Sequence, residues 1–197
     1  MIRKMIKFMF YSLGAAIIIP LAVITFSIIL RGPMYRTMVD YDQASVRSYG
    51  GYNLTDSELI EDLNAWAEDH PDADAEDISN KALRATAREL RFATSQSTSN
   101  PNGLIKSGKA HCVGYASVYC AVSRHLIDEL GLSNKYRCDH LVGHLYMLDQ
   151  NLHSFINHRF FSNHDYNRII DLKTREEHLA DPSLYDYLRI NQVSNRE

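Results

Sequence analysis

Residues 112–132 read CVGYASVYCAVSRHLIDELGL, and the organisation of the whole 197-residue chain can be worked out from this segment. Small and apolar residues recur in it at intervals of three and four, which is the spacing of one buried face of an α-helix. These residues are Ala116, Tyr119, Cys120, Ser123, Leu126, Ile127 and Leu130. Gly131 follows where a C-terminal cap is expected, because glycine adopts the left-handed conformation of such a cap without strain. The pattern predicts a buried helix that begins at Cys112.

Cys112 stands in the first turn of this predicted helix, where a thiol is well placed for activation. Unpaired backbone N–H groups and the helix dipole lower the pKa of a cysteine there, and the thiolate is the reactive form. Gly114 leaves room beside the thiol, and residues 108–111 can bend so that backbone N–H groups face an incoming carbonyl. Cys120 lies two turns further along and is interpreted as a small core residue. Cys112 is therefore the candidate nucleophile.

The segments on either side of this helix predict an α+β fold. Two short apolar segments that follow it, at residues 136–150 and 167–172, are rich in Tyr, Ile, Val and Leu and predict strands. Two segments that precede it, at residues 56–69 and 75–92, have helical spacing or a helix-forming composition. Helices followed by strands are typical of the α+β class.

The phrase Cys112-Val113-Gly114-Tyr115-Ala116, at the head of a helix that ends in a Leu-Gly pair, resembles the nucleophile motif of the transglutaminase-like superfamily of papain-like cysteine enzymes. Members of that family place a histidine on the next strand and an aspartate on the neighbouring strand. His144 and Asp171 occupy such positions in this sequence. The resemblance covers roughly residues 55–175.

This resemblance implies a catalytic triad of Cys112, His144 and Asp171. Cys112 would attack an acyl group, His144 would take the thiol proton and return it to the leaving amine, and Asp171 would orient the imidazolium. Gln96 is the one glutamine in the loop before the helix. It is a candidate oxyanion donor, in competition with a solvated loop role.

Two members of this triad have competitors in the sequence. The interval between His144 and Asp171 is longer than the short hairpin usual in the family, and it contains a polar insert at residues 151–165. Asp165 is therefore a second candidate for the orienting acid. His140 lies close to His144 and is a second candidate for the base.

A metal site is a competing interpretation of the same region, because eight of the nine histidines lie at or after residue 111. Cys138, His140 and His144 would share one face of a continuous strand, and their side chains suit zinc. Gly143 is expected to interrupt such a strand, and neither Cys-x-x-Cys nor His-Glu-x-x-His spacing is present. No metal and no other cofactor is therefore expected.

Residues 8–30 form an uncharged, largely apolar segment that is long enough to cross a bilayer, for which about 20 residues are needed. The segment is longer than the apolar core of a cleaved signal peptide and does not end in small residues, so it predicts an uncleaved signal anchor. The basic residues that precede it are Arg3, Lys4 and Lys7. They favour a single-pass topology with the N-terminus in the cytoplasm and the domain outside it, in the periplasm if the source is Gram-negative.

These features divide the chain into three parts. Residues 1–31 are expected to form the signal anchor, residues 32–53 a juxtamembrane linker without clear periodicity, and residues 54–197 the transglutaminase-like domain. The predicted fold is an α+β, papain-like transglutaminase core with N-terminal helices followed by an antiparallel sheet, preceded by one transmembrane helix.

Charge and cysteine content limit the possible partners. The net charge is -3 and basic residues alternate with acidic ones, so nucleic acid is not an expected partner. Three cysteines are too few for a disulfide scaffold and odd in number. At least one free thiol is expected even if the other two pair.

The sequence therefore predicts a membrane-anchored thiol acyl-transfer enzyme that acts on amide bonds of a peptide or protein substrate. It would be a cysteine peptidase, an amidase or a transglutaminase-type enzyme, since these differ only in whether water or an amine resolves the acyl-enzyme. The alternative is a catalytically silent transglutaminase-like module that holds a peptide as an accessory part of an envelope complex. The expected partners are the substrate and the membrane, the latter through residues 8–30.

Overall fold

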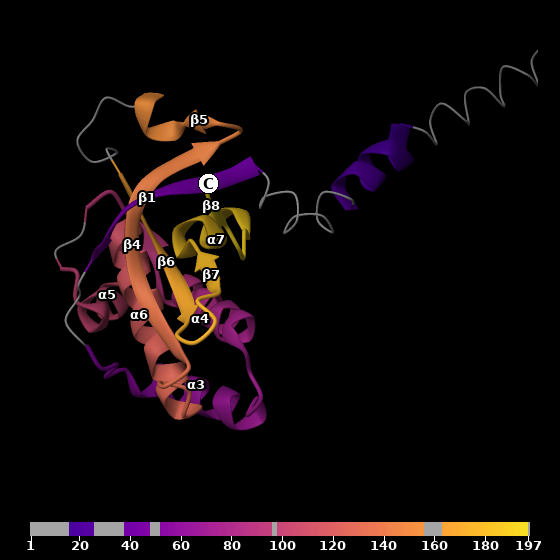
Figure 1. The fold of residues 1–197 in the computed structure, drawn as a ribbon. Helices are drawn as coiled ribbons and strands as arrows, with labels where there is room; N and C mark the ends of the chain where they lie inside the picture. The colour runs from indigo at the N-terminus through magenta and orange to yellow at the C-terminus, as the bar shows by residue number, and fades with distance from the viewer. Residues whose placement is uncertain (1–15, 26–37, 48–51, 96–97, 156–162, 197) are drawn as a thin grey trace, which may run out of the picture.

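The computed structural model describes five segments of the chain, which are residues 16–25, 38–47, 52–95, 98–155 and 163–196. In these segments the chain has an α+β architecture in which helices pack beside a curved sheet (Figure 1).

The main sheet of the described segments has six strands and is mixed. Their bounds are β1 (Val39–Arg47), β4 (Tyr136–Met147), β5 (Gln150–Asn151), β6 (His164–Asp171), β7 (Glu177–Ala180) and β8 (Ser194–Asn195). The order is β7-β6-β4-β1-β8, with β5 paired to β4. β8 runs parallel to β1, whereas the other neighbours are antiparallel. A bridge between Leu179 and Val193 joins the two ends of this order, so the sheet nearly closes on itself.

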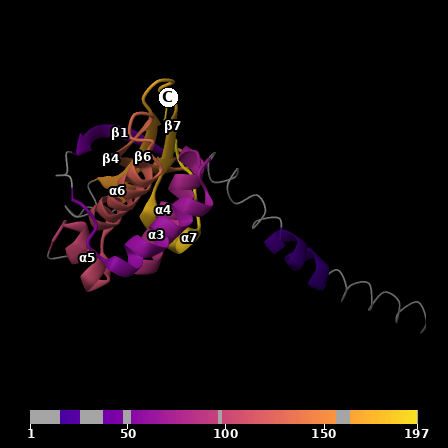
Figure 2. The same ribbon diagram turned by 90° about the horizontal axis from the view of Figure 1, so that it is seen from below.

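The helices gather on one side of the strands (Figure 2). Their bounds are α3 (Ser57–Asp69), α4 (Ala75–Glu89), α5 (Pro101–Ser107), α6 (Cys112–Glu129) and α7 (Pro182–Leu188), with a 3₁₀ turn at Leu152–Phe155. A small parallel pair, β2 (Arg91–Phe92) and β3 (Lys109–Ala110), lies outside the main sheet. Helix α6 runs along β4 and β6 and also contacts α3 and α4, so it is the central helix of the fold.

Side-chain caps determine where the first of these helices begin. Asp56 accepts a hydrogen bond from the backbone N–H of Leu59 at the start of α3. Asp74 and Asp77 form a reciprocal capping box at the start of α4. Each cap satisfies backbone donors that have no partner inside the helix.

Two apolar clusters stabilise the sheet from its two faces. The larger one lies between the sheet and the helices and includes most of the buried face of α6. The smaller one lies within the curve of the sheet and is built on Tyr41 and Tyr166, whose rings stack with centroids 4.2 Å apart. Because the two clusters use opposite faces, side chains that alternate along β4 and β6 are buried on both sides.

Several predicted elements are confirmed. The helix expected from Cys112 is α6, and Gly131 after it has φ of +67°, as its capping role requires. The helices predicted at residues 56–69 and 75–92 are α3 and α4, and the two predicted strands are β4 and β6.

The transmembrane helix in the fold prediction is wrong. Of residues 8–30 the structure describes only 16–25, which are helical, and the rest of that segment lies outside the described residues. Among the residues that are described, no helix is both long and apolar enough to span a bilayer.

The predicted order of helices followed by an antiparallel sheet is also wrong. Val39–Arg47, which the sequence analysis assigned to a linker, forms β1 and pairs with β4. The signal was present in the alternation of Val39 and Tyr41, both fully buried, with Asp40 and Asp42. The final strand, β8, adds a parallel neighbour to β1, so the sheet is mixed rather than antiparallel.

Gly143 lies in the middle of β4, which continues through it rather than stopping there as predicted. It faces Gln43 next to an irregularity in β1. A Cβ atom at this position would lie 2.0 Å from the carbonyl oxygen of Asp42 and 3.3 Å from Cε1 of Tyr166. Only glycine therefore lets the two strands approach this closely.

Replacing Gly143 by alanine should force β1 away from β4 and lower the free energy of unfolding by about 1–3 kcal/mol, as overpacking does. The measurement is urea denaturation followed by circular dichroism. Gly131→Ala is the matched control, because a Cβ atom added there would have no neighbour within 4 Å and only the left-handed backbone opposes alanine. The free energy of unfolding of this control should fall by about 1 kcal/mol. Equal losses for the two variants would contradict the close-approach argument.

Candidate functional site

Cys112 is the first residue of α6, as the sequence predicted, and its side chain is partly buried. The backbone N–H groups of Asp165 and Val113 donate hydrogen bonds to its sulfur. Val113 belongs to the first turn of α6, where N–H groups have no partner within the helix, whereas Asp165 belongs to β6. The thiol therefore lies at the contact between the helix start and the sheet.

Asp165, whose backbone N–H contacts this thiol, belongs to a buried histidine–aspartate pair. His140 Nε2 is 2.8 Å from Oδ1 of Asp165, and both side chains are 1% exposed. In the register of the sheet, His140 lies opposite Asn167, and Asp165 lies opposite Val142. His140 and Asp165 are therefore diagonal neighbours on adjacent strands, on the face of the sheet that α6 covers. His140 comes from β4 and Asp165 from the neighbouring β6.

Asn167 fixes the helix against this face of the sheet. Its Nδ2 donates to the backbone carbonyl of Ala116 at 3.0 Å, one turn after Cys112. The same nitrogen is 3.3 Å from the sulfur of Cys120. These contacts fix the position of α6 along β6 and hence place Cys112 beside Asp165.

Arg47 completes the cluster and was missed in the sequence analysis. It lies opposite His140 in β1, and its Nε donates to the same Oδ1 of Asp165 at 2.7 Å. Burial alone would raise the pKa of Asp165, but the hydrogen bond and charge of His140 and the charge of Arg47 outweigh burial and lower it. Asp165 is therefore a stable carboxylate acceptor.

The protonation states of the thiol and the imidazole follow from burial. Burial and the negative charges of Asp165 and Asp181 raise the pKa of Cys112 to about 11, and the backbone N–H donors offset this only in part. Burial lowers the pKa of His140, despite the opposing effect of Asp165. At neutral pH the site therefore holds a protonated thiol and a neutral imidazole, which is the state in which histidine can accept a proton.

The other two residues of the predicted triad lie elsewhere. His144 is partly exposed and its Nδ1 is 3.2 Å from Oδ1 of Asp42, four residues or about 13 Å beyond His140 along β4. Asp171 faces Tyr136 at the opposite end of β4 and accepts backbone hydrogen bonds in the turn that follows β6. The structure thus brings Cys112 beside Asp165 and pairs Asp165 with His140, and it does not bring Asp171 to either histidine.

The remaining candidates are placed as follows. Gln96 lies outside the described residues. Cys138, His140 and His144 do share one face of β4, but no cluster of three or more histidine, cysteine or acidic side chains that suits a metal ion occurs in the described part of the chain. The zinc interpretation therefore gains no support from the described geometry.

A second buried histidine–aspartate pair lies nearby on the inner side of the sheet. His164 Nε2 is 2.7 Å from Oδ2 of Asp181, which also accepts a hydrogen bond of 2.5 Å from the hydroxyl of Tyr41. Burial would lower the pKa of His164, but the charge and hydrogen bond of Asp181 raise it. Asp181 also caps α7 through Ser183 and Leu184, which explains its burial in structural terms.

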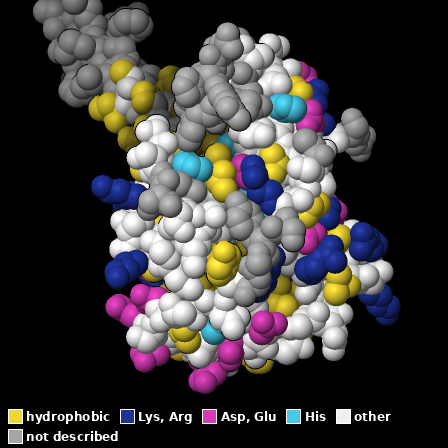
Figure 3. All heavy atoms as spheres, turned by 90° about the vertical axis from the view of Figure 1, so that its left-hand side faces the viewer, with side chains coloured by type: hydrophobic (Ala, Val, Ile, Leu, Met, Phe, Trp, Pro, Cys, Tyr) yellow, Lys and Arg dark blue, Asp and Glu magenta, His cyan; other side chains and the backbone are white. Residues whose placement is uncertain are grey.

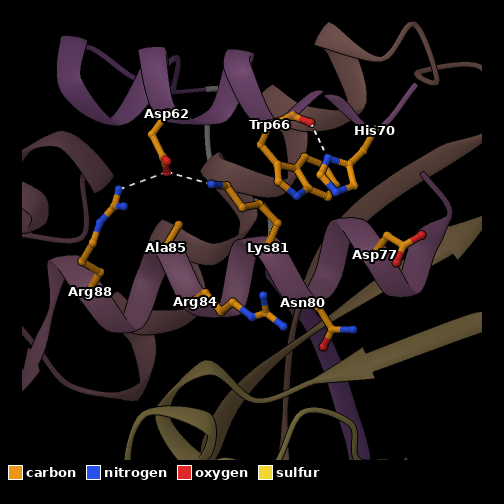
Figure 4. A pocket seen from close by; sticks show the side chains of 9 residues that line it. All are labelled: Asp62, Trp66, His70, Asp77, Asn80, Lys81, Arg84, Ala85 and Arg88. Atoms are coloured by element: carbon orange, nitrogen blue, oxygen red, sulfur yellow. Dashed lines mark hydrogen bonds and ion pairs between the residues drawn. The ribbon is translucent and has the colours of Figure 1, made fainter. Parts of the chain in front are cut away.

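A polar hollow of about 420 Å³ lies between α3 and α4 (Figure 4). Asp62 bridges Lys81 at 2.8 Å and Arg88 at 3.3 Å on one side of it, and the stacked rings of Trp66 and His70 form the other side. None of the residues that line it comes from α6, β4 or β6. The hollow is therefore separate from the site at Cys112.

The surface shown in Figure 3 carries both signs of charge. Acidic side chains gather at the lower end of this face, while basic ones lie at its two sides and in its upper middle. The described part of this face has no continuous basic stripe of the kind that follows a nucleic-acid backbone.

No family model matches the sequence, and no curated protein and no solved structure matches the chain. The likeness to transglutaminase-like enzymes therefore depends on the motif at Cys112 alone. Any function must be argued from the geometry of the site.

The raised pKa of Cys112 predicts slow alkylation in the folded protein. The rate with iodoacetamide should climb towards pH 11, whereas in urea it should level off near the free value of about 8.5. At neutral pH the folded protein should react on the order of a hundredfold more slowly than the unfolded chain. Tandem mass spectrometry would locate the label on Cys112. A plateau below neutral pH in the folded protein would instead indicate a thiolate paired with an imidazolium.

Proposed function

We propose that this chain is a thiol acyl-transfer enzyme that acts on amide bonds, with Cys112 as nucleophile, His140 as base and Asp165 as orienting acid. The observation that carries the proposal is the buried His140–Asp165 pair, 2.8 Å apart, whose Asp165 also donates a hydrogen bond from its backbone N–H to the sulfur of Cys112. A nucleophile, a base and a third group that orients the base are the general form of an activated nucleophile.

The pair also determines which ring nitrogen takes the proton. With the imidazole neutral, Nε2–H of His140 donates to the carboxylate of Asp165, so the thiol proton passes to Nδ1. Arg47 keeps Asp165 ionised, and this carboxylate stabilises the imidazolium that forms during attack. Proton transfer during attack also removes the need for a thiolate at neutral pH.

The chemistry that follows is that of an acyl-enzyme. The sulfur of Cys112 bonds to the carbonyl carbon of the substrate, the C–N bond breaks, and the imidazolium of His140 returns its proton to the leaving amine. Water or a second amine then resolves the thioester. Peptides and proteins are the substrate class that fits, because their amide bonds supply both the carbonyl and the leaving amine.

A catalytically silent module that holds a peptide is the second candidate function, and two observations favour it. Burial raises the pKa of Cys112 to about 11. The hollow beside His140 has a volume of about 10 Å³, which is barely enough for one water molecule. The residues that line this hollow include His140 and Cys120 but not Cys112.

The test uses p-nitrophenyl acetate, an activated acyl donor, with the full chain at neutral pH. The parent should gain one acetyl group on Cys112 and release p-nitrophenolate, because sulfur displaces the phenolate at the carbonyl carbon. His140→Ala should acetylate about 100-fold more slowly, since general-base assistance is lost. The acetylation rate of Asp165→Asn should lie between those of the parent and His140→Ala, because Asp165 orients the base and does not itself carry the proton.

His144→Ala and Asp171→Ala are the matched controls, since each removes the same side-chain type at a position away from the cluster, and both should react at the parent rate. Circular dichroism spectra of all variants would exclude unfolding as the cause of a loss. Acetylation of Cys112 at the same rate in His140→Ala as in the parent would refute the enzyme proposal and favour the peptide-binding module.

A further inference from the structure

The two cysteines outside the site lie against each other in the core. Cys120 is on the buried face of α6 and Cys138 is on the face of β4 that α6 covers. Their sulfurs are 2.7 Å apart, and the residues are only 4% and 1% exposed.

We propose that Cys120 and Cys138 are the site of a disulfide bond that joins α6 to β4. A covalent S–S bond is about 2.05 Å long, so a small shift of the two sulfurs completes it. The elements that carry them are regular and packed against one another, so the shift needs no rearrangement of the backbone. This proposal does not depend on the proposed function.

Cys112 is excluded as a partner by its position. It lies eight residues before Cys120 in the same helix, a separation of about 12 Å along the axis. Disulfides require Cα atoms within about 7 Å. Cys112 therefore keeps a free thiol when the other two cysteines are joined.

The reaction is thiol–disulfide exchange with a small-molecule or protein disulfide as oxidant. The thiolate of one cysteine attacks the oxidant, releases one thiolate and forms a mixed disulfide. The thiolate of the second cysteine then attacks the sulfur of the first cysteine in this mixed disulfide. The S–S bond between Cys120 and Cys138 forms, and the second half of the oxidant leaves as a thiolate, so that the oxidant has gained two electrons. Because both thiols are buried in the folded protein, exchange takes place before α6 packs on β4 or during its opening.

The bond would tie together the two elements that position the site. Cys138 precedes His140 by two residues on the same face of β4, and Cys120 follows Cys112 in α6. A link between them prevents the helix from sliding along the strand. It also closes a loop of 18 residues, from Cys120 to Cys138, and so restricts the unfolded chain.

The test refolds the full chain from urea in the presence of oxidised glutathione, then blocks the remaining thiols with iodoacetamide in urea and maps the tryptic peptides. Cleavage after Lys109 and Arg124 leaves Cys112 and Cys120 in one peptide. The Cys112→Ser variant is therefore the decisive sample, because any link to the Cys138 peptide must then involve Cys120. We expect that link, two hydrogens lighter than the separate peptides, and its loss in dithiothreitol.

A second measurement compares the thermal unfolding of the oxidised and reduced forms of the unsubstituted protein. The oxidised protein should unfold about 5–10 °C above the reduced protein, as expected for a loop of this length. Full alkylation of Cys120 and Cys138 after treatment with oxidised glutathione would overturn the proposal, and so would a link that includes Cys112. Because Cys112→Ser lacks the nucleophile, formation of the link in this variant is independent of whether the protein is an enzyme.

Discussion

The contact between the first turns of α6 and strands β4 and β6 is the constraint on which the site depends. The hydrogen bond from Asn167 to the carbonyl of Ala116 holds the helix at one height. Cys112 then lies beside the strand that supplies Asp165, and Asp165 in turn holds His140. Asp165 thus contacts both Cys112 and His140, which lie far apart in the sequence, because the helix is held in one position on the sheet.

Much of the fold was accessible from the sequence because it is periodic. The helix from Cys112 was found from its three- and four-residue spacing, which does not depend on the rest of the chain. Which of the candidate histidines and aspartates lie next to each other was not accessible in this way, because it depends on the register of β4 against β6. Arg47 was missed for a related reason, since the strand with which β1 pairs is about a hundred residues away in the sequence.

The site also shows two opposing effects on one thiol. A helix start lowers the pKa of a cysteine, and this led to the choice of Cys112. Burial and the carboxylates of Asp165 and Asp181 act in the opposite direction and prevail. Position in a helix thus made Cys112 a candidate, while its tertiary surroundings set its protonation state, which sequence periodicity does not describe.

The pairing of β1 with β8 has a consequence for the order of folding. These strands are the first and last of the sheet in the sequence, and they are neighbours in space. Contacts of such long range close large loops and form slowly. During synthesis β1 therefore has one open edge until residue 195 has left the ribosome, and the inner cluster around Tyr41 is among the last parts of the protein to be sealed from water.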